Sequence, residues 1–196
     1  MIAIVNYCAG NLNSVKKAFD YLAAESVVTN KPELVLAAEK IVLPGVGHFS
    51  SLRAMSCSGL REALLRAVSA GKPLLGICLG MQWLFEGSEE CSEIAGAGFF
   101  PGKCRQFPSS VKSPHVGWNS LTVRQSSRLL RGVAPDSFVY YTHSFHAPVV
   151  NAMVAGTQYG LLFAGAVEQD NIFGVQFHPE KSGDVGLSIL KNFCEL

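Results

Sequence analysis

The stretch PLLGICLGMQ, residues 73–82, places one cysteine between two glycines where an apolar run meets a helix-like pattern. The apolar residues 74–77 predict a buried strand. Gly76, Cys78 and Gly80 then match Gly-x-nucleophile-x-Gly, the elbow in which a sharp strand-to-helix turn presents a nucleophilic side chain. Side chains at the two glycine positions would collide as the helix packs back over the strand. The stretch therefore predicts the strand-then-helix unit of an α/β fold.

Cys78 has two interpretations from this stretch alone. As a nucleophile it would sit at a helix N-terminus, where free N–H groups and the helix dipole favour the thiolate over the thiol. As a structural residue it would be a small apolar side chain at an ordinary strand end. The elbow pattern is short, so it leaves both interpretations open.

Apolar runs and helical periodicities around the elbow extend this alternation. Strands are predicted at residues 2–6 and 40–43, and amphipathic helices at 12–22 and 60–68, the latter ending near Gly71. This β-α-β-α order predicts a mostly parallel central sheet flanked by helices on both faces.

The second half of the chain is typical of antiparallel structure. Short β-like pieces lie between Gly96 and Gly117, and further strands are predicted at residues 121–123, 138–141, 161–167 and 172–177. Asp184 is expected to cap a last helix. No repeat or linker interrupts the chain, so we expect one α/β domain over residues 1–196 with antiparallel strands added in the C-terminal half.

Composition excludes several classes of function. Of the 196 residues, 48% are hydrophobic and 16% are charged, and the net charge is +1. This balance provides no field that would attract nucleic acid or an anionic membrane. No apolar run approaches the ~20 residues needed to span a bilayer. The start, MIAIVNYCAG, indicates a first strand rather than a signal peptide, so a cytoplasmic location is expected.

The cysteines show no pattern of a metal site or a disulfide framework. The six lie at positions 8, 57, 78, 91, 104 and 194. No two form Cys-x-x-Cys, and no histidine pair has zinc-ligand spacing, so free thiols are expected. A P-loop, an H-E-x-x-H helix and an EF-hand loop are also missing from the sequence, so neither a metal nor a cofactor is expected.

A histidine near a predicted strand end could be the base that Cys78 needs. It lies in GVQFHPEKSG, residues 174–183. Residues two apart on a strand point to the same side, so His178 and Glu180 are expected to lie close together. Cys78, His178 and Glu180 would then form a triad of nucleophile, base and orienting carboxylate. The alternative is a surface strand end with an unrelated His and Glu, but the elbow in the same chain favours the triad.

Attack by a thiolate on a carbonyl creates an oxyanion, which needs two N–H donors. The N–H of Leu79, next to the nucleophile, is one candidate. The glycine-rich turn LPGVGHF, residues 43–49, could supply the other from the backbone of Val46 or Gly47, because glycines let a backbone approach a substrate closely. This turn could equally be a plain strand-to-helix connection.

Three motifs in this order, PGVG at 44–47, GICLGMQ at 76–82 and FHPEKSG at 177–183, resemble the class I glutamine amidotransferases. Within that family, NYCAGNLNSV at 6–15 and HVGWN at 115–119 look like the glutaminase subunits of imidazole glycerol phosphate synthases, which act in histidine biosynthesis. The resemblance runs from residue 2 to near the end of the chain.

The resemblance implies a reaction and a substrate site. Cys78 would attack the side-chain amide of L-glutamine, and the products would be glutamate and ammonia. Gln82 and the backbone of Ser144 and Phe145 would hold the glutamine. Glu90 would bind its α-ammonium group, since a buried cation needs a carboxylate. A solvated pair of charges at positions 89 and 90 is the alternative for that glutamate.

The resemblance also implies a partner, a (β/α)₈-barrel cyclase subunit that forms a heterodimer with the chain. The cyclase would use the ammonia to make imidazole glycerol phosphate and aminoimidazole carboxamide ribotide. Trp118 would be an interface anchor, although a core tryptophan is the alternative. The positions expected near this interface are Asn11, Ser14, Trp118, Tyr140 and Lys181. Cys8 stands where many members of the family have glycine, and it adds strain if its φ is positive.

The sequence leaves two alternative functions open. A different class I amidotransferase or a γ-glutamyl hydrolase would use the same triad with another acceptor or partner. A cysteine-elbow redox or stress protein would use the thiol without catalysis. Such a protein has no need of the His-x-Glu pair, which therefore argues against it.

Overall fold

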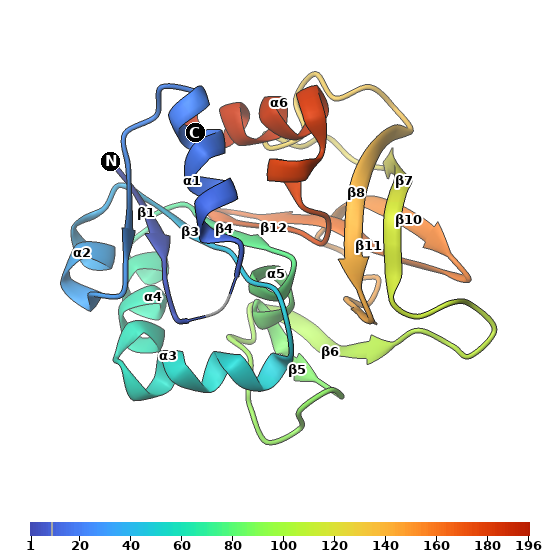
Figure 1. Ribbon diagram of the computed structural model, residues 1–196, viewed down its shortest axis with the longest axis horizontal. Coiled ribbons are helices and arrows are strands. Elements are labelled where there is room, and N and C mark those ends of the chain that lie inside the picture. Colours follow the sequence, from blue (N-terminus) through green and yellow to red (C-terminus); the bar gives the residue numbers. More distant parts are fainter. Residues whose placement is uncertain (9) are drawn as a thin grey trace.

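The computed structural model describes residues 1–8 and 10–196. Its main sheet has nine strands in the order β2-β1-β3-β4-β12-β11-β10-β7-β8 (Figure 1). The parallel strands are β1 (Ile2–Val5), β2 (Ser26–Thr29), β3 (Lys40–Leu43), β4 (Leu74–Ile77) and β12 (Ile172–Val175). The antiparallel strands are β7 (His115–Val123), β8 (Ser137–His143), β10 (Met153–Tyr159) and β11 (Leu161–Gln169). The predicted architecture is confirmed.

Helices cover both faces of the parallel part (Figure 1). One face carries α2 (Pro32–Ala37), α3 (Arg53–Cys57) and α4 (Leu60–Ser69), and the other carries α1 (Leu12–Tyr21) and α6 (Gly183–Cys194). Side chains alternate along each strand, so Ile41 and Leu43 pack with α4 residues, whereas Val42 packs with α1 and α6 residues. The two apolar layers bury the sheet and fix which strand ends meet.

Smaller elements lie around the C-terminal ends of the parallel strands. They are η1 (Phe49–Leu52), α5 (Leu79–Trp83), β5 (Phe85–Ser88), β6 (Phe100–Gln106), β9 (Phe145–His146) and η2 (Pro179–Lys181). The strands β5, β6 and β9 form a second sheet of three strands. In α/β folds ligands bind at the carboxyl ends of parallel strands, so this end is where a site is expected.

The structure differs from the expected elements at several places. The predicted strand at 121–123 is the end of a longer β7, which begins at His115 and whose first half contains Gly117 and exposes its apolar side chains. Asp184 was expected as a helix cap, and this is wrong. Ser182 precedes α6 as its N-cap, and Asp184 lies in the first turn of the helix.

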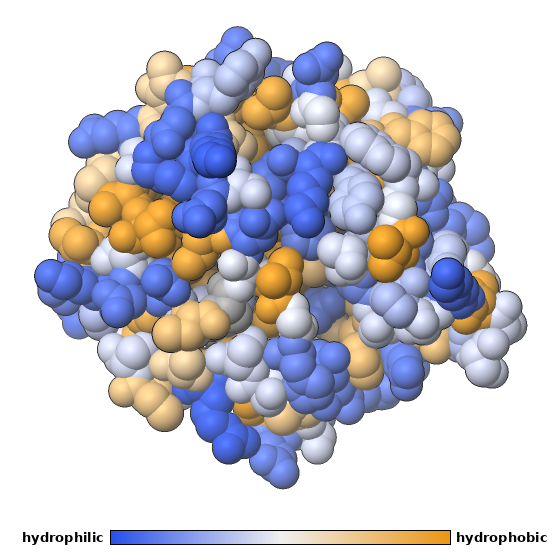
Figure 2. All heavy atoms as spheres, viewed as in Figure 1, coloured by the Kyte–Doolittle hydropathy of each residue, from blue (hydrophilic) through white to orange (hydrophobic). Residues whose placement is uncertain are grey.

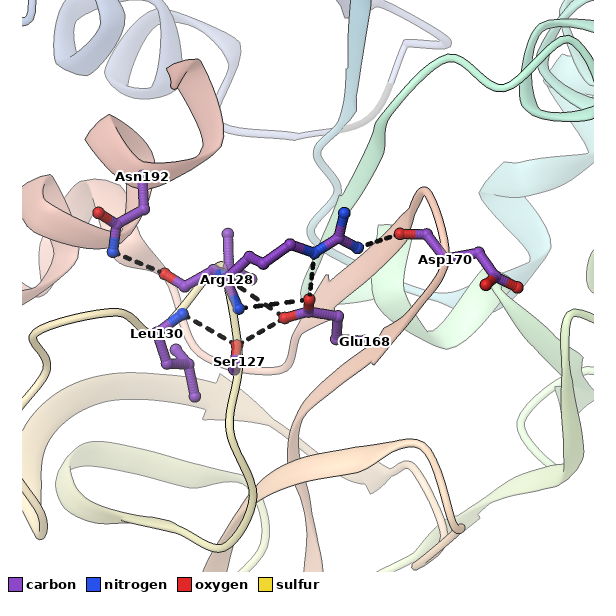
Figure 3. A network of polar contacts seen from close by, with 7 residues as sticks. Ser127, Arg128, Leu130, Glu168, Asp170 and Asn192 are labelled. Carbon is purple, nitrogen blue, oxygen red and sulfur yellow. Dashed lines mark hydrogen bonds and ion pairs between the residues drawn. The ribbon is translucent and has the colours of Figure 1, made fainter. Parts of the chain in front are cut away.

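A network of polar contacts ties the connection between β7 and β8 to the rest of the molecule (Figure 3). Glu168 on β11 is its centre, accepting hydrogen bonds from the Ser127 hydroxyl at 2.6 Å and from Arg128 Nε at 2.8 Å. Asn192 of α6 donates to the Leu129 carbonyl at 2.9 Å. The connection is therefore anchored to both the sheet and the last helix.

On the face shown in Figure 2, apolar residues form separate patches among hydrophilic ones, and one patch lies where Figure 1 places β7 and β8. Val116 and Trp118 of β7 and Phe138 of β8 are large apolar side chains that are exposed. Within the ranges 1–8 and 10–196, no helix is long and apolar enough to cross a membrane.

Candidate active site

Cys78 lies on a tight turn between β4 and α5. Its φ is 53°, a positive value that non-glycine residues rarely adopt. A Cβ atom added to Gly76 would lie 2.6 Å from the Gly80 carbonyl oxygen, and one added to Gly80 would lie 1.8 Å from the Leu43 carbonyl oxygen. Both approaches are closer than atoms tolerate. The steric reason given for the two glycines is confirmed, and Cys78 stands on a nucleophile elbow.

Two strand ends besides β4 reach the Cys78 sulfur. The Gln176 side-chain amide, just after β12, donates to Sγ over 3.8 Å. The thiol in turn lies 3.9 Å from the Thr142 carbonyl oxygen on β8. The thiol is buried but lines a cavity, so a substrate in that cavity would contact the sulfur.

His178 and Glu180 lie beside each other, but not for the reason expected. Nδ1 of His178 is 2.9 Å from Oε1 of Glu180, and each side chain is 1% exposed. The prediction that the two residues lie on one strand is wrong, because β12 ends at Val175 and Glu180 belongs to the short helix η2. Pro179 fixes φ and begins that helix, which turns the glutamate back toward the imidazole.

The charge state of His178 depends on both neighbours. Burial alone would lower the pKa of His178, but the charge of Cys78, the hydrogen bond to Glu180 and the charge of Glu180 raise it above its usual value. A carboxylate can only accept, so Nδ1 carries the proton of that hydrogen bond. Nε2 is buried and has no hydrogen-bond partner among the described residues. The imidazole can therefore carry a second proton at Nε2, near Cys78.

A cavity of about 230 Å³ opens beside the thiol. It is below the roughly 300 Å³ at which drug-sized sites begin, which suits a ligand the size of an amino acid. Seven of the expected site residues line it: Gly47, Cys78, Leu79, Gln82, Glu90, Ser144 and Phe145. Pro114, Thr142 and His143 complete the lining.

Glu90 and Gln82 are held in place at the cavity wall. Oε2 of Glu90 accepts a hydrogen bond of 2.7 Å from the Phe49 N–H, which fixes the carboxylate at the cavity. Gln82 donates from Nε2 to the Phe145 carbonyl at 2.8 Å. Glu89 is exposed and pairs with Arg105 at 3.4 Å, so the two adjacent glutamates have different surroundings.

The expected oxyanion donors are not all free. The Leu79 N–H donates to the Gly45 carbonyl over 3.4 Å, a long and weak hydrogen bond. Gly47 lines the cavity, whereas Val46 lies in the same turn without lining it. In this state the glycine-rich turn therefore occupies one of the two donors that an oxyanion would need.

The five expected interface residues gather around η2. Trp118 is 54% exposed, so the alternative of a core tryptophan is wrong. Its ring lies 6.0 Å from that of Tyr140, over which Lys181 Nζ lies at 5.7 Å.

The other two lie close to the carboxylate of Glu180. Asn11 donates to Glu180 Oε1 at 3.5 Å, and Ser14 lines a cleft that Glu180 also lines. Cys8 is exposed and has a φ of 67°, so its backbone position is one that favours glycine, and the condition stated for strain at this residue is met.

Sequence reasoning missed four residues of the cavity region: Pro114, Thr142, His143 and Gln176. Gln176 could have been found, because it is a polar residue in an apolar strand end just before His178. The other three come from β8 and the segment before β7, and no local pattern marks them. Among the described residues, no group of three or more His, Cys, Asp or Glu side chains could hold a metal ion.

Comparison with known proteins gives consistent matches. The family model "Glutamine amidotransferase class-I" matches residues 4–196. The "Imidazole glycerol phosphate synthase subunit HisH" of Methanothermobacter thermautotrophicus is 46% identical, over 100% of this chain and 98% of the relative. The protein of the same name from Methanocaldococcus jannaschii is 44% identical over 100% of both chains.

Solved structures are similar in fold at low sequence identity. A crystal structure of a glutamine amidotransferase has a TM-score of 0.78 with 17% identity, over 100% of both chains. PurLQS from Thermotoga maritima has a TM-score of 0.72 with 19% identity, over 99% of this chain and 97% of that one.

Proposed function

The chain belongs to the class I glutamine amidotransferase family, and from this premise we propose how its residues carry out the reaction. It is the glutaminase subunit of an imidazole glycerol phosphate synthase, which releases ammonia from L-glutamine for histidine biosynthesis. The observation that carries the proposed mechanism is the buried Nε2 of His178, which has no hydrogen-bond partner among the described residues and lies near Cys78, which lines the cavity.

Cys78 acts as the nucleophile and His178 as the acid and base. The thiolate attacks the side-chain amide carbon, and the imidazolium of His178 gives its Nε2 proton to the leaving ammonia. The neutral imidazole then removes a proton from water, which attacks the glutamyl thioester and releases glutamate. Glu180 keeps the imidazole in the orientation and tautomer that these transfers need.

The cavity wall selects an amino acid. The backbone of Ser144 and Phe145 binds the α-carboxylate of glutamine, and Glu90 binds its α-ammonium group. Gln82 supports this wall through its hydrogen bond of 2.8 Å to the Phe145 carbonyl. The oxyanion is stabilised by the Leu79 N–H with a second N–H from Val46 or Gly47, once the Gly45 carbonyl has left Leu79.

The ammonia passes to a cyclase subunit, which we propose is a (β/α)₈ barrel bound as a heterodimer in the cytoplasm. Its docking surface consists of Asn11, Ser14, Trp118, Tyr140 and Lys181. The exposed side chains of Val116 and Phe138 extend this surface on the same hairpin. Exposed aromatic side chains of this kind are common anchors of protein interfaces.

The test is glutamate release from L-glutamine by the purified chain, alone and with the cyclase subunit and its nucleotide ligand. Strong stimulation by the cyclase is expected, because the Leu79 donor is occupied in the free chain. Cys78→Ala should abolish release without unfolding the protein, whereas Cys57→Ala, which removes an exposed thiol, should leave the rate unchanged. Glutamate release by the Cys78→Ala variant would contradict the proposed mechanism.

The roles of the base and its partner differ measurably. His178→Ala should lower kcat by about 10²–10⁴-fold, since it removes the group that transfers protons. Glu180→Gln should cost less under the same conditions, because glutamine still accepts a hydrogen bond from Nδ1. Equal losses, or a larger loss for Glu180→Gln, would contradict the orienting role.

A further inference from the structure

A chain of hydrogen bonds runs through two buried histidines to the cavity wall. Nδ1 of His143 is 2.8 Å from the Phe145 carbonyl oxygen. Nδ1 of His115 is 3.2 Å from Nε2 of His143. Nδ2 of Asn119 is 3.3 Å from Nε2 of His115. His143 lines the cavity, and the relative exposure of His115 and His143 is 3% and 7%.

The direction of donation along these hydrogen bonds follows from the last acceptor, the Phe145 carbonyl. A carbonyl oxygen can only accept, so His143 carries its proton on Nδ1, and its Nε2 must accept from His115 Nδ1. His115 then offers Nε2 as an acceptor to the Asn119 amide. That amide is oriented independently, because Asn119 Nδ2 also donates to the Gln158 carbonyl at 3.1 Å and Oδ1 accepts from the Ser120 N–H at 2.8 Å. Both histidines are thus neutral Nδ1–H tautomers.

This series of hydrogen bonds ends at Phe145, whose carbonyl is held from two sides. The Phe145 carbonyl accepts from His143 and, at 2.8 Å, from Gln82. The preceding peptide is held by the Phe107 N–H, which donates to the Ser144 carbonyl at 3.2 Å. Three hydrogen bonds therefore hold the Ser144 and Phe145 carbonyls, and both residues line the cavity together with Cys78.

We infer that His115 and His143 form a neutral dyad of positioning residues, which aims the Ser144 and Phe145 backbone at the carboxylate of the amino-acid substrate. This inference rests on the proposed function, because it concerns the same cavity. The dyad touches neither the sulfur nor the reacting carbon, so its effect falls on substrate binding rather than on the chemical step.

The surroundings keep the dyad uncharged. His115 stacks on Tyr159 and Tyr141, with ring centroids at 4.0 Å and 4.8 Å. Burial lowers the pKa of His115 to about 4.

Burial also lowers the pKa of His143 to about 3, although its hydrogen bond to the Phe145 carbonyl opposes this. The titratable groups that face His143 are His115, His146 and His178, and each lowers the pKa of His143 further.

Two matched variants separate the positioning role from a merely structural one. His143→Asn places an amide N–H near the position of Nδ1 and can keep the bond to Phe145, whereas His143→Gln places its amide near Nε2 and cannot. We expect His143→Gln to raise KM for glutamine about 10-fold with kcat changed less than about 2-fold, and His143→Asn to raise KM less than about 3-fold. Thermal unfolding of both variants reports any common loss of stability.

A second readout does not depend on activity. Long-range ¹H–¹⁵N correlation spectra of the wild-type chain should show His115 and His143 as neutral Nδ1–H tautomers from pH 5 to pH 8. If both substitutions leave KM unchanged while the wild type hydrolyses glutamine, the dyad does not position the wall and the proposed function stands. If the spectra show an Nε2–H tautomer or a protonated ring at pH 7, the direction of the chain is wrong whatever the enzyme does.

Discussion

Tyr7 carries a buried hydroxyl that has no hydrogen-bond partner in the described part of the chain. It lies tightly under the glycine-rich turn, since a Cβ atom on Gly45 would be 2.1 Å from the hydroxyl oxygen. Burial raises the pKa of Tyr7, and the charge of Cys78 raises it further, so the phenol stays protonated. A buried hydroxyl without a partner costs about 1–3 kcal/mol.

Tyr7→Phe should therefore increase the free energy of unfolding, by about 1 kcal/mol, because it removes the unpaired group and keeps the ring. Tyr141→Phe is the matched control, since the Tyr141 hydroxyl is buried and 2.6 Å from the Thr157 hydroxyl. That substitution should lower the free energy of unfolding by a similar amount. Urea unfolding of both variants checks the pair, and equal destabilisation by the two would show that Tyr7 has a partner.

The residues that the sequence identified are those whose role is local. Cys78 could be predicted because the two glycines around it are required by contacts within and beside its own turn. Thr142 and His143 could not be predicted, because they reach the cavity only through the pairing of β8 with β7. Glu180 was correctly predicted to lie beside His178, but the predicted reason, alternation along a strand, was wrong because Glu180 lies in η2.

At the scale of elements, the connection between β7 and β8 depends on Glu168. Burial alone would raise the pKa of Glu168, but hydrogen bonds from Ser127, Arg128 and Leu129 lower it below its usual value. The guanidinium of Arg128 also lies 4.9 Å above the ring of Phe173. One carboxylate thus ties three consecutive residues of this connection, Ser127, Arg128 and Leu129, to β11.

Glu168→Gln should lower the free energy of unfolding by roughly 1–3 kcal/mol, because a neutral amide cannot accept all of these hydrogen bonds. Because the folded pKa is depressed, the contribution is complete above the usual glutamate pKa of about 4.3 and is lost as pH falls through the lower folded value. Denaturant unfolding at pH 7 checks the size. Glu195→Gln is the control, since its partner Arg131 is exposed and such pairs contribute little.

Elements with a clear apolar run or hydrophobic periodicity were predicted well, whereas elements whose form depends on tertiary contacts were not. The bounds of β3 and β4 agree with the expected strands because both are short apolar runs buried on two faces. The edge strand β2 is half-buried and gave no such run, and β10 breaks alternation because both of its faces are covered. The helix η2 was missed because three residues are too few for a period.

At the scale of the whole molecule, buried neutral histidines make stability depend on pH. The pKa of His143 is about 3 in the fold and about 6.5 when unfolded, so the unfolded chain binds more protons below pH 6.5. The free energy of unfolding should therefore fall as pH drops, with His143 alone removing about 2 kcal/mol between pH 7 and pH 5.

Urea unfolding at several pH values checks this expectation. The His143→Asn variant should lose less stability over the same interval, because it has no imidazole to protonate on unfolding. His178 does not oppose the trend below pH 6.5, since its pKa is raised in the fold and its contribution is already complete there. A wild-type curve that is flat from pH 7 to pH 5 would contradict the buried neutral state.

Trp118 on β7, an exposed side chain that lies beside Tyr140 on β8, is expected to be an anchor for the cyclase. Trp118→Ala should weaken that binding by at least about 10-fold, because anchors of this kind carry much of an interface. Glutamine hydrolysis by the free chain should stay unchanged. Val149→Ala removes an apolar side chain of similar exposure, 51% against 54%, outside the hairpin, and should leave the affinity unchanged. Titration of labelled cyclase measures both.

The position of β12 has a consequence for how the protein is made. This strand comes after all the other strands along the chain, yet it lies between β4 and β11 in the sheet. A nascent chain that has not yet released β12 from the ribosome also lacks His178 and Glu180, which follow β12 in the sequence, so these side chains cannot yet lie near Cys78. The same nascent chain leaves the edge of β4 unpaired, and pairing over so long a separation is slow. The same C-terminal segment therefore both covers the edge of β4 and brings His178 near Cys78.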